Sequence, residues 1–379
     1  MNIFLVILGS VILFGVLLEA FESIILPRRV TRRFRFTRLF YRLSWMPWRA
    51  IGGWFPAKRR ESFYSYFGPL SLLFLLIFWA IGLLIGFALL ILAAGPPAEN
   101  YHTPIHFADA FFISGTNFFT LGLADVVPHT PSSRFVTVFE AGIGLGFLAL
   151  VIGYLPTIFQ SFSKREVSVV LLDARAGSPP TAAELLRRHS YRGGFDALQK
   201  LFYEWERWSA ELMESHLSYP VLCYFRSQHD NQSWLGALIA ILDACALTIV
   251  SVPGEGAKQA KLTFAVTRHA VVDLAQIFHA VPRPPKPDRL SSEDLARIRR
   301  TLQEAGINIR GSEAEDRKLN ELRAMYEPYA YALAEFLAVR LPPWIHTQAI
   351  VDNWSTSAWG RISGASREDQ IGDGNDPHF

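Results

Sequence analysis

The sequence has few of the residues on which catalytic and metal centres depend. Only two of its 379 residues are cysteine, Cys223 and Cys245, and neither has metal-ligand spacing. Both are expected to remain reduced thiols. No strand pattern leads into a G-x-G-x-x-G motif, and the G-E-G at 254–256 is expected to be a turn. The sequence therefore gives no sign of a disulfide scaffold, a zinc domain or a Rossmann-type nucleotide-binding domain.

A catalytic constellation is also missing. His269, Asp273 and His279 fall on one predicted helix, without a nucleophile in a plausible position, and such groups are usually surface residues. We therefore expect no enzymatic activity and no cofactor.

Acidic residues are absent from one whole segment. Between Arg28 and Arg60 the chain has 11 of its 37 lysines and arginines and none of its 34 acidic residues. The rest is net acidic, so the formal charge of +3 predicts no nucleic-acid binding. A short basic loop beside an apolar segment usually lies in the cytoplasm. This places the N-terminus outside and residues 164–379 in the cytoplasm, in a multi-pass protein of the cell (inner) membrane.

Long hydrophobic runs are present. Hydrophobic residues make up 50% of the chain, and the mean hydropathy is +0.20. Three apolar segments, 2–26, 70–92 and 135–162, are each long enough to cross a hydrocarbon core of about 30 Å. The first has neither the basic start nor the small-residue cleavage site of a signal peptide, so an uncleaved anchor is favoured. Three transmembrane helices are expected.

The loop between the second and third spans contains a short helix signal and then a polar turn. Thr103-Pro104 is typical of a helix start, which predicts a helix from Pro104 towards Phe118. T-L-G-L-A-D follows at 120–125, and Pro128 comes soon after. A short helix that stops before a glycine-containing segment is typical of a re-entrant loop. Its backbone must be buried in protein or line a water-filled path.

This stretch, followed by a long apolar helix, resembles the pore signature T-V-G-Y-G-D-x-x-P of the potassium channel pore-loop superfamily. The resemblance covers about residues 69–163 and implies an outer helix, a pore helix, a selectivity filter and an inner helix in a homotetramer. It implies that Thr120, Leu121, Gly122, Leu123, Ala124 and Asp125 form the filter. Potassium ions would be held by the backbone oxygens of Thr120, Leu121, Gly122 and Leu123 and by the Thr120 hydroxyl.

The signature departs from the family at two positions. Leu123 stands where the family usually has tyrosine, and Ala124 stands where it has the second glycine. Potassium selectivity is therefore less secure than a cation pore, and a weakly selective cation channel is the alternative. A membrane sensor or scaffold that keeps the pore-loop fold without conducting is a second alternative.

The third span begins with Thr130-Pro131, another helix start, and is expected to run to about Ser163 with a cytoplasmic overhang where a gate could lie. Glu140, near its outer end, either faces the surroundings of the filter or is an interfacial carboxylate without a role. Small residues and a proline follow, and they indicate either a gating hinge or close helix packing. These residues are Gly142, Gly144, Gly146, Gly153 and Pro156.

The linker 27–68 has the pattern of an amphipathic helix at the membrane surface. Its arginines are spaced three or four apart and are expected to bind anionic lipid: Arg28, Arg32, Arg35, Arg38 and Arg42. Trp45, Trp48 and Trp54 suit the headgroup region. Glu19 and Glu22, near the end of the first span, are expected to pair with these arginines.

Residues 164–361 are expected to form an α-helical cytoplasmic domain that gates the pore, assembles the oligomer or recruits a partner. Helical periodicity marks 181–189, 195–213, 232–250, 257–278, 291–304 and 313–341. The apolar run 234–250 carries Asp243 at its middle, which favours a buried domain helix over a fourth span. Residues 362–379 are polar and expected to be disordered. The predicted fold is thus an all-α membrane protein with three spans, a re-entrant pore helix and filter, and a helical cytoplasmic domain.

Overall fold

The computed structural model describes residues 2–26, 36–94, 106–122, 130–229, 231–252, 257–307 and 311–346. These residues form helices and no strand. Four of the helices are long and apolar enough to cross a membrane. The protein is therefore an all-α membrane protein, as its apolar segments predict. The chain divides into two compact units, Met1–Gln160 and Ser161–Phe379.

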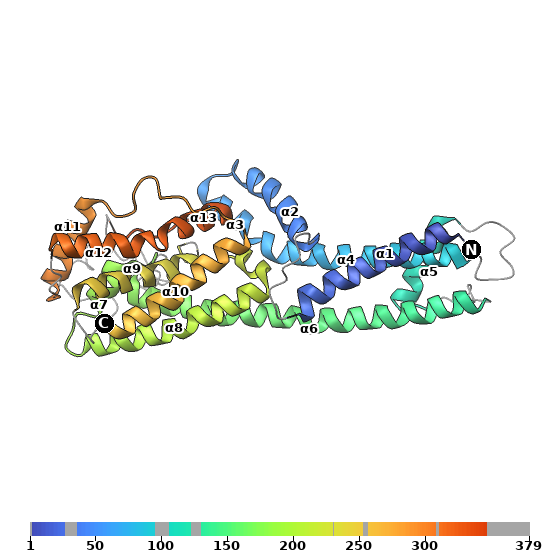
Figure 1. The fold of residues 1–379 in the computed structure, drawn as a ribbon, viewed down its shortest axis with the longest axis horizontal. Helices are drawn as coiled ribbons and strands as arrows, with labels where there is room; N and C mark the ends of the chain where they lie inside the picture. The colour runs from blue at the N-terminus through green and yellow to red at the C-terminus, as the bar shows by residue number, and fades with distance from the viewer. Residues whose placement is uncertain are drawn as a thin grey trace, which may run out of the picture. The chain divides into compact units, whose positions relative to one another are not determined.

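In the N-terminal unit, α1 lies along α4 (Figure 1). Helix α1 covers Ile3–Ala20 and continues as a π-helical turn, Phe21–Ile25, while α4 covers Phe67–Ala94. The two backbones meet at Gly9 and Gly86, where a Cβ on Gly9 would lie 2.7 Å from the Gly86 oxygen. Small residues at such a crossing let membrane helices approach closely.

The predicted basic linker contains two helices, α2 (Phe36–Gly52) and α3 (Ala57–Ser65). The Glu19 carboxylate accepts hydrogen bonds from the N–H groups of Phe36 and Thr37 at 3.0 and 3.1 Å. A carboxylate is favourable there because the first N–H groups of a helix have no partner within it. Arginines 28–35, with which Glu19 was expected to pair, lie outside the described residues.

The tryptophans of this linker, all expected to suit the headgroup region, do not share one environment. Trp54 is exposed, whereas Trp45 is buried. Trp45 packs against Tyr64 of α3 and Phe67 of α4 with ring centroids 5.5 and 4.8 Å apart. Its apolar ring therefore contributes to the packing of α2 on α3 and α4.

Two further helices complete this unit. Helix α5 covers Phe107–Phe118, and α6 begins at Pro131 as expected, with the N–H of Ser133 donating to the Thr130 hydroxyl at 3.1 Å. The expected end of α6 near Ser163 is wrong, because the helix runs to Ala176. No helix-breaking residue interrupts 157–176, and the helix ends where Gly177 takes a left-handed φ of +82°.

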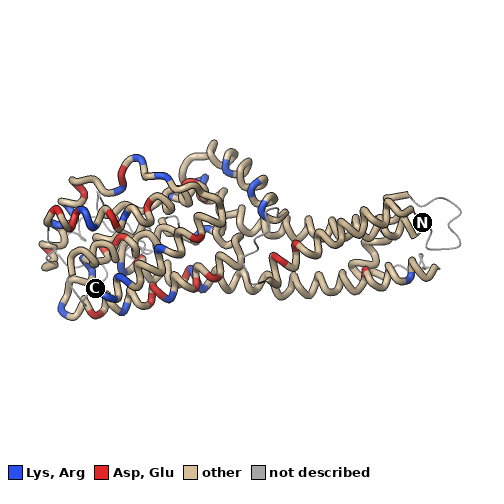
Figure 2. The backbone as a smooth tube through the Cα atoms, viewed as in Figure 1, with Lys and Arg blue, Asp and Glu red and all other residues tan. Residues whose placement is uncertain are grey.

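The C-terminal unit comprises the end of α6 and a set of shorter helices (Figure 1), with charged residues of both signs throughout (Figure 2). These are α7 (Ala182–Arg188), α8 (Gly194–Ser218), a 3-10 turn (Pro220–Tyr224), α9 (Trp234–Ser251), α10 (Lys258–Ile277), α11 (Ser292–Glu304), α12 (Glu313–Ala324) and α13 (Glu327–Leu337).

Helix α9 lies at the centre of this unit, in contact with α7, α8, α10, α12 and α13. Its most apolar stretch is 83% buried, against 11% for that of α6. The prediction of a buried domain helix is confirmed. The single helix expected over 313–341 is instead two helices, α12 and α13. Pro328 lacks an N–H and would collide with the carbonyl of Ala324, and here the helix breaks, so that Pro328 lies in the first turn of α13.

Candidate functional site

The short helix α5 packs against both α4 and α6. Ala110 and Ile113 of α5 form a buried apolar cluster with Ala88 and Ile91 of α4. With 12 residues, α5 is roughly 18 Å long, too short to cross a hydrocarbon core. It begins at Phe107 rather than at the expected Pro104, and the Asp109 carboxylate accepts a hydrogen bond from the N–H of His106 at 3.0 Å.

The C-terminal end of α5 turns the chain into the TLGLAD stretch. The N–H of Leu121 donates to the Thr116 carbonyl at 2.8 Å, and the N–H of Thr120 donates to the Asn117 carbonyl at 3.1 Å. These two bonds make a Schellman turn, whose left-handed position is usually glycine. Here that position is Thr120, with a φ of +55°. A β-branched residue in this conformation is strained, and such strain is concentrated at functional sites.

Beyond Thr120 the backbone stays outside regular structure. Leu121 is exposed, and Gly122 again takes a left-handed φ of +63°. Small or flexible positions of this kind let successive carbonyls point in one direction. The other predicted filter residues, Leu123, Ala124 and Asp125, lie outside the described residues.

Glu140 connects α6 to the last turn of α5. Its carboxyl group is fully buried, with Oε1 2.5 Å from the Ser114 hydroxyl and Oε2 accepting from Asn117 Nδ2 at 3.3 Å. Of the two interpretations of the sequence, the structure supports a position beside the end of the pore helix. The backbone carbonyl of Asn117 also accepts a hydrogen bond from the N–H of Thr120. Asn117 therefore links Glu140 to the strained turn.

Of four glycines in α6, one packs closely against α5, and the other three have space for a side chain. A Cβ on Gly144 would lie 2.1 Å from the carbonyl oxygen of Phe118, at the end of α5. Gly142, Gly146 and Gly153 have no such neighbour within 4 Å in the described residues. Pro156 lies inside the helix, and nearby the Thr157 hydroxyl donates to the Gly153 carbonyl at 2.9 Å.

The predicted lipid-binding arginines are only partly described. Arg38 and Arg42 lie on the exposed side of α2, close to the exposed Leu39 and Leu43. Arg28, Arg32 and Arg35 lie outside the described residues.

Sequence reasoning missed a buried arginine near the end of α6. The guanidinium of Arg165 donates to the carbonyls of Leu222 and Phe225, both at 2.9 Å, and pairs with Glu166 at 2.8 Å. Its Nη1 also lies 3.1 Å from Nε2 of His216. Burial and the charge of Arg165 lower the pKa of His216 well below its ordinary value, so His216 is neutral and accepts this bond. The end of α6 is thus bound into the C-terminal unit.

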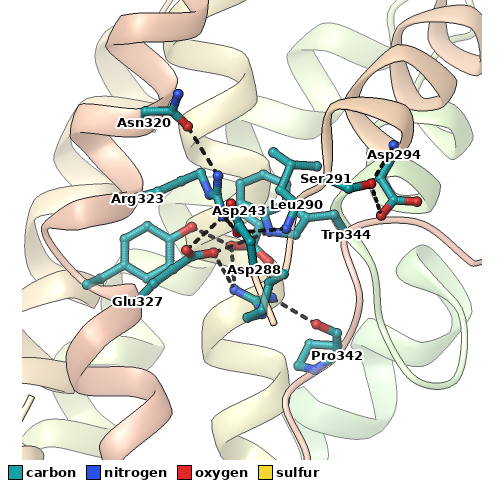
Figure 3. Close-up of polar contacts among 12 residues, drawn as sticks. Asp243, Asp288, Leu290, Ser291, Asp294, Asn320, Arg323, Glu327, Pro342 and Trp344 are labelled. Carbon is teal, nitrogen blue, oxygen red and sulfur yellow. Dashed lines mark hydrogen bonds and ion pairs between the residues drawn. The ribbon is translucent and has the colours of Figure 1, made fainter. Parts of the chain in front are cut away.

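A second buried polar cluster includes Asp243 of α9 (Figure 3). Arg289 pairs with Asp243 at 2.7 Å and with Glu327 at 2.9 Å, and it donates to the Pro342 carbonyl at 2.8 Å. Burial alone would lower the pKa of Arg289, but the charge and hydrogen bond of Asp243 raise it, so Arg289 stays charged. This cluster explains how Asp243 is tolerated in an apolar helix: its charge is paired.

Comparison with known proteins agrees with this geometry. Residues 72–161 match the family model described as an ion channel. No curated protein and no solved structure gives a significant match to the chain. The matched segment spans most of α4, all of α5, the TLGLAD stretch and α6 as far as Ser161. This segment of the chain belongs to the pore-loop channel superfamily and is the pore module of an ion channel.

Proposed function

We propose that the chain is one subunit of a homotetrameric channel that conducts cations passively, with potassium as the main permeant ion. The observation that carries the proposal is the order of α4, α5, T-L-G and α6 within the ion-channel match, with a strained turn at Thr120 where the filter would begin. The proposal involves transport and no chemical conversion.

Ion conduction would follow from the backbone of residues 120–125. Rings of carbonyl oxygens, together with the Thr120 hydroxyl, would replace the hydration shell of the ion. The C-terminal end of α5 would favour a cation because the helix dipole is negative there. One pore loop cannot enclose a path, so several chains around one axis are needed, and the resemblance to the potassium channel superfamily implies four. The low burial of α6 supports this, because other subunits or lipid must cover its apolar surface.

Membrane orientation would follow the basic linker. The positive-inside rule places α2 and α3 in the cytoplasm, the N-terminus and the filter outside, and the C-terminal unit in the cytoplasm of a cell (inner) membrane. Gating would act on α6, because the same helix carries Gly144 beside α5 and Arg165 in the C-terminal unit. A change within the C-terminal unit would therefore reach the pore through one continuous helix.

The test is ion flux in liposomes with a potassium gradient and a matched sodium gradient. We expect potassium flux well above sodium flux from protein that elutes as a tetramer. Correctly assembled tetramers without flux of either ion would contradict conduction and favour a sensor or scaffold.

A weakly selective cation channel is the second candidate, and the residues at 123 and 124 favour it. Ala124 at a position that needs left-handed backbone would cost on the order of 1 kcal/mol relative to glycine. Leu123 cannot form the hydrogen bond of a tyrosine hydroxyl. Equal potassium and sodium flux in the wild type would support this candidate. The double variant Leu123→Tyr/Ala124→Gly should then raise the potassium preference.

We also propose that α2 binds anionic lipid through Arg38 and Arg42, together with the arginines before it. Each arginine near an anionic surface contributes about 1 kcal/mol. In cosedimentation with anionic vesicles, Arg38→Gln/Arg42→Gln should weaken binding by roughly tenfold or more. Arg207→Gln on the exposed side of α8 is the matched control, and equal loss in both would contradict a role for α2.

A further inference from the structure

The hydrogen bonds of Ser114 set a constraint on Glu140. Ser114 Oγ lies 2.5 Å from Glu140 Oε1 and 3.0 Å from the carbonyl oxygen of Leu84 in α4. A serine hydroxyl has one proton and can donate only one of these two bonds. The carbonyl of Leu84 has no proton to give. Both contacts are full two-centre hydrogen bonds, rather than one proton shared between two acceptors, only if the carboxyl group of Glu140 supplies the second proton.

The surroundings of Glu140 agree with a neutral carboxyl group. Its side chain is fully buried, and its partners are Ser114 and Asn117, both uncharged. Helix α4 has no titratable residue, and the only one on α5 is Asp109, at the opposite end. On α6 the nearest is Arg134, which is exposed and about nine ångströms along the axis. An isolated buried carboxylate is so costly that such groups become neutral instead.

We infer that Glu140 is protonated at neutral pH and acts as a positioning residue that ties α6 and α5 to α4 behind the filter. The Glu140 carboxyl donates to Ser114, and the Ser114 hydroxyl donates to the Leu84 carbonyl. The amide of Asn117 donates to the other carboxyl oxygen. Each of the three hydrogen bonds in this network then has its own proton, and three helices are joined without a net charge in the apolar part of the protein.

This inference rests on the proposed function only for its effect on conduction. The side-chain amide of Asn117 donates to the Glu140 carboxyl, and the backbone carbonyl of Asn117 accepts from the N–H of Thr120. A loss of the neutral network would therefore shift the turn that begins the filter. The protonation state itself is a property of the folded protein, whether or not ions pass.

Infrared difference spectroscopy of the full-length protein in liposomes at pH 7 tests the protonation. The spectrum of the wild type minus Glu140→Gln should contain the C=O stretching band of a carboxylic acid, and ¹³C-glutamate labelling should move it. Glu211→Gln is the matched control, because Glu211 pairs with Lys164 at 3.0 Å and should give carboxylate bands only. If the difference spectrum for Glu140→Gln contains carboxylate bands and no carboxylic acid band, the inference is overturned.

A second variant covers the case in which Glu140→Gln does not assemble. Ser114→Ala leaves Glu140 in place but removes its hydroxyl acceptor, so the acid band should move to higher frequency. An unchanged or absent band would overturn the inference.

Conduction gives a separate reading of the positioning role. Glutamine keeps one donor and one acceptor at position 140, so Glu140→Gln should retain the ion preference of the wild type. Glu140→Leu removes both and should lower that preference severalfold. An equal effect of the two variants would refute the positioning role. An acid band in protein without any flux would instead support protonation and refute the proposed channel function.

Discussion

Alanine at Gly144 is expected to displace the end of the pore helix. An ideal Cβ at this position lies 2.1 Å from the Phe118 carbonyl oxygen, whereas real contacts of a Cβ are essentially never under 3.0 Å. The two helices must therefore separate by about 0.9 Å, the difference between those two distances. The obstructing atom belongs to the backbone, so no side-chain rotation can relieve the contact. Phe118 is two residues before Thr120, and the shift acts directly on the proposed filter.

The expected cost is set by two opposing effects. Overpacking of this kind typically costs about 1–3 kcal/mol. Alanine in a helix gains about 0.5–1 kcal/mol relative to glycine. Gly144→Ala should thus be destabilising on balance, and in the proposed tetramer the cost would occur four times. Alanine at Gly142, Gly146 or Gly153 meets no atom of the described chain within 4 Å and should keep the helical gain.

The assay compares these four variants by thermal unfolding in detergent and by potassium and sodium flux in liposomes. Gly144→Ala should unfold at lower temperature than the wild type and lose flux or ion preference. The three controls should match or exceed the wild type in unfolding temperature, and Gly142→Ala and Gly146→Ala should also keep its flux. If Gly144→Ala behaves like its controls, the close approach of α6 to α5 does not hold. If only the controls lose activity, bending of α6 rather than packing explains the glycines.

Three more predictions concern α6 and the C-terminal unit. Arg165→Gln removes a buried charge with several partners and should destabilise the protein by about 3–5 kcal/mol, measured by urea unfolding. Lys164→Gln, whose exposed amine forms a surface pair, should cost less than about 1 kcal/mol, and similar costs would contradict the buried role. Burial raises the pKa of Glu184, but two neighbouring arginines outweigh it and lower the pKa to about 2. The contribution of Glu184 to stability is thus complete above its unfolded value of about 4.3 and is lost as the pH falls towards 2. The difference in melting temperature between wild type and Glu184→Gln should shrink over that window, and a constant difference would contradict the pairing. Pro156→Ala restores a helical hydrogen bond and should change the open probability in single-channel recordings, and an unchanged value would exclude a hinge at that position.

Features set by local sequence could be predicted, and features set by contacts between distant segments could not. The apolar runs and the Thr130-Pro131 start identified the helices because hydrophobicity and capping are local properties. The break within 313–341 has a local signal in Pro328, although proline alone does not decide it, because α6 continues through Pro156. The predicted end of α6 near Ser163 is too early, because no residue between Ser163 and Gly177 breaks a helix.

The polar partners of the buried charges were beyond sequence reasoning. Glu140 can be recognised in the sequence as a carboxylate within an apolar run. Its partner Ser114 is 26 residues away, and their contact becomes visible only when α5 and α6 are packed together. Arg165 lies in the polar sequence that follows a span, and nothing in its neighbours distinguishes it from a surface arginine. Thr120 takes a left-handed conformation because the turn after α5 requires it, although its own side chain disfavours it.

The two interpretations of the small residues in α6 apply to different parts of the helix. Gly144 is fixed by the Phe118 carbonyl, and Arg165 is fixed by the carbonyls of Leu222 and Phe225. Between these fixed points, a Cβ added at Gly153 would meet no atom of a neighbouring segment within 4 Å in the described residues, and Pro156 removes one backbone hydrogen bond. A helix held at both ends bends where its own hydrogen bonds are weakest and its surface is least packed. Close packing is therefore observed at Gly144, and we expect any bending that moves the pore to occur between Gly153 and Pro156.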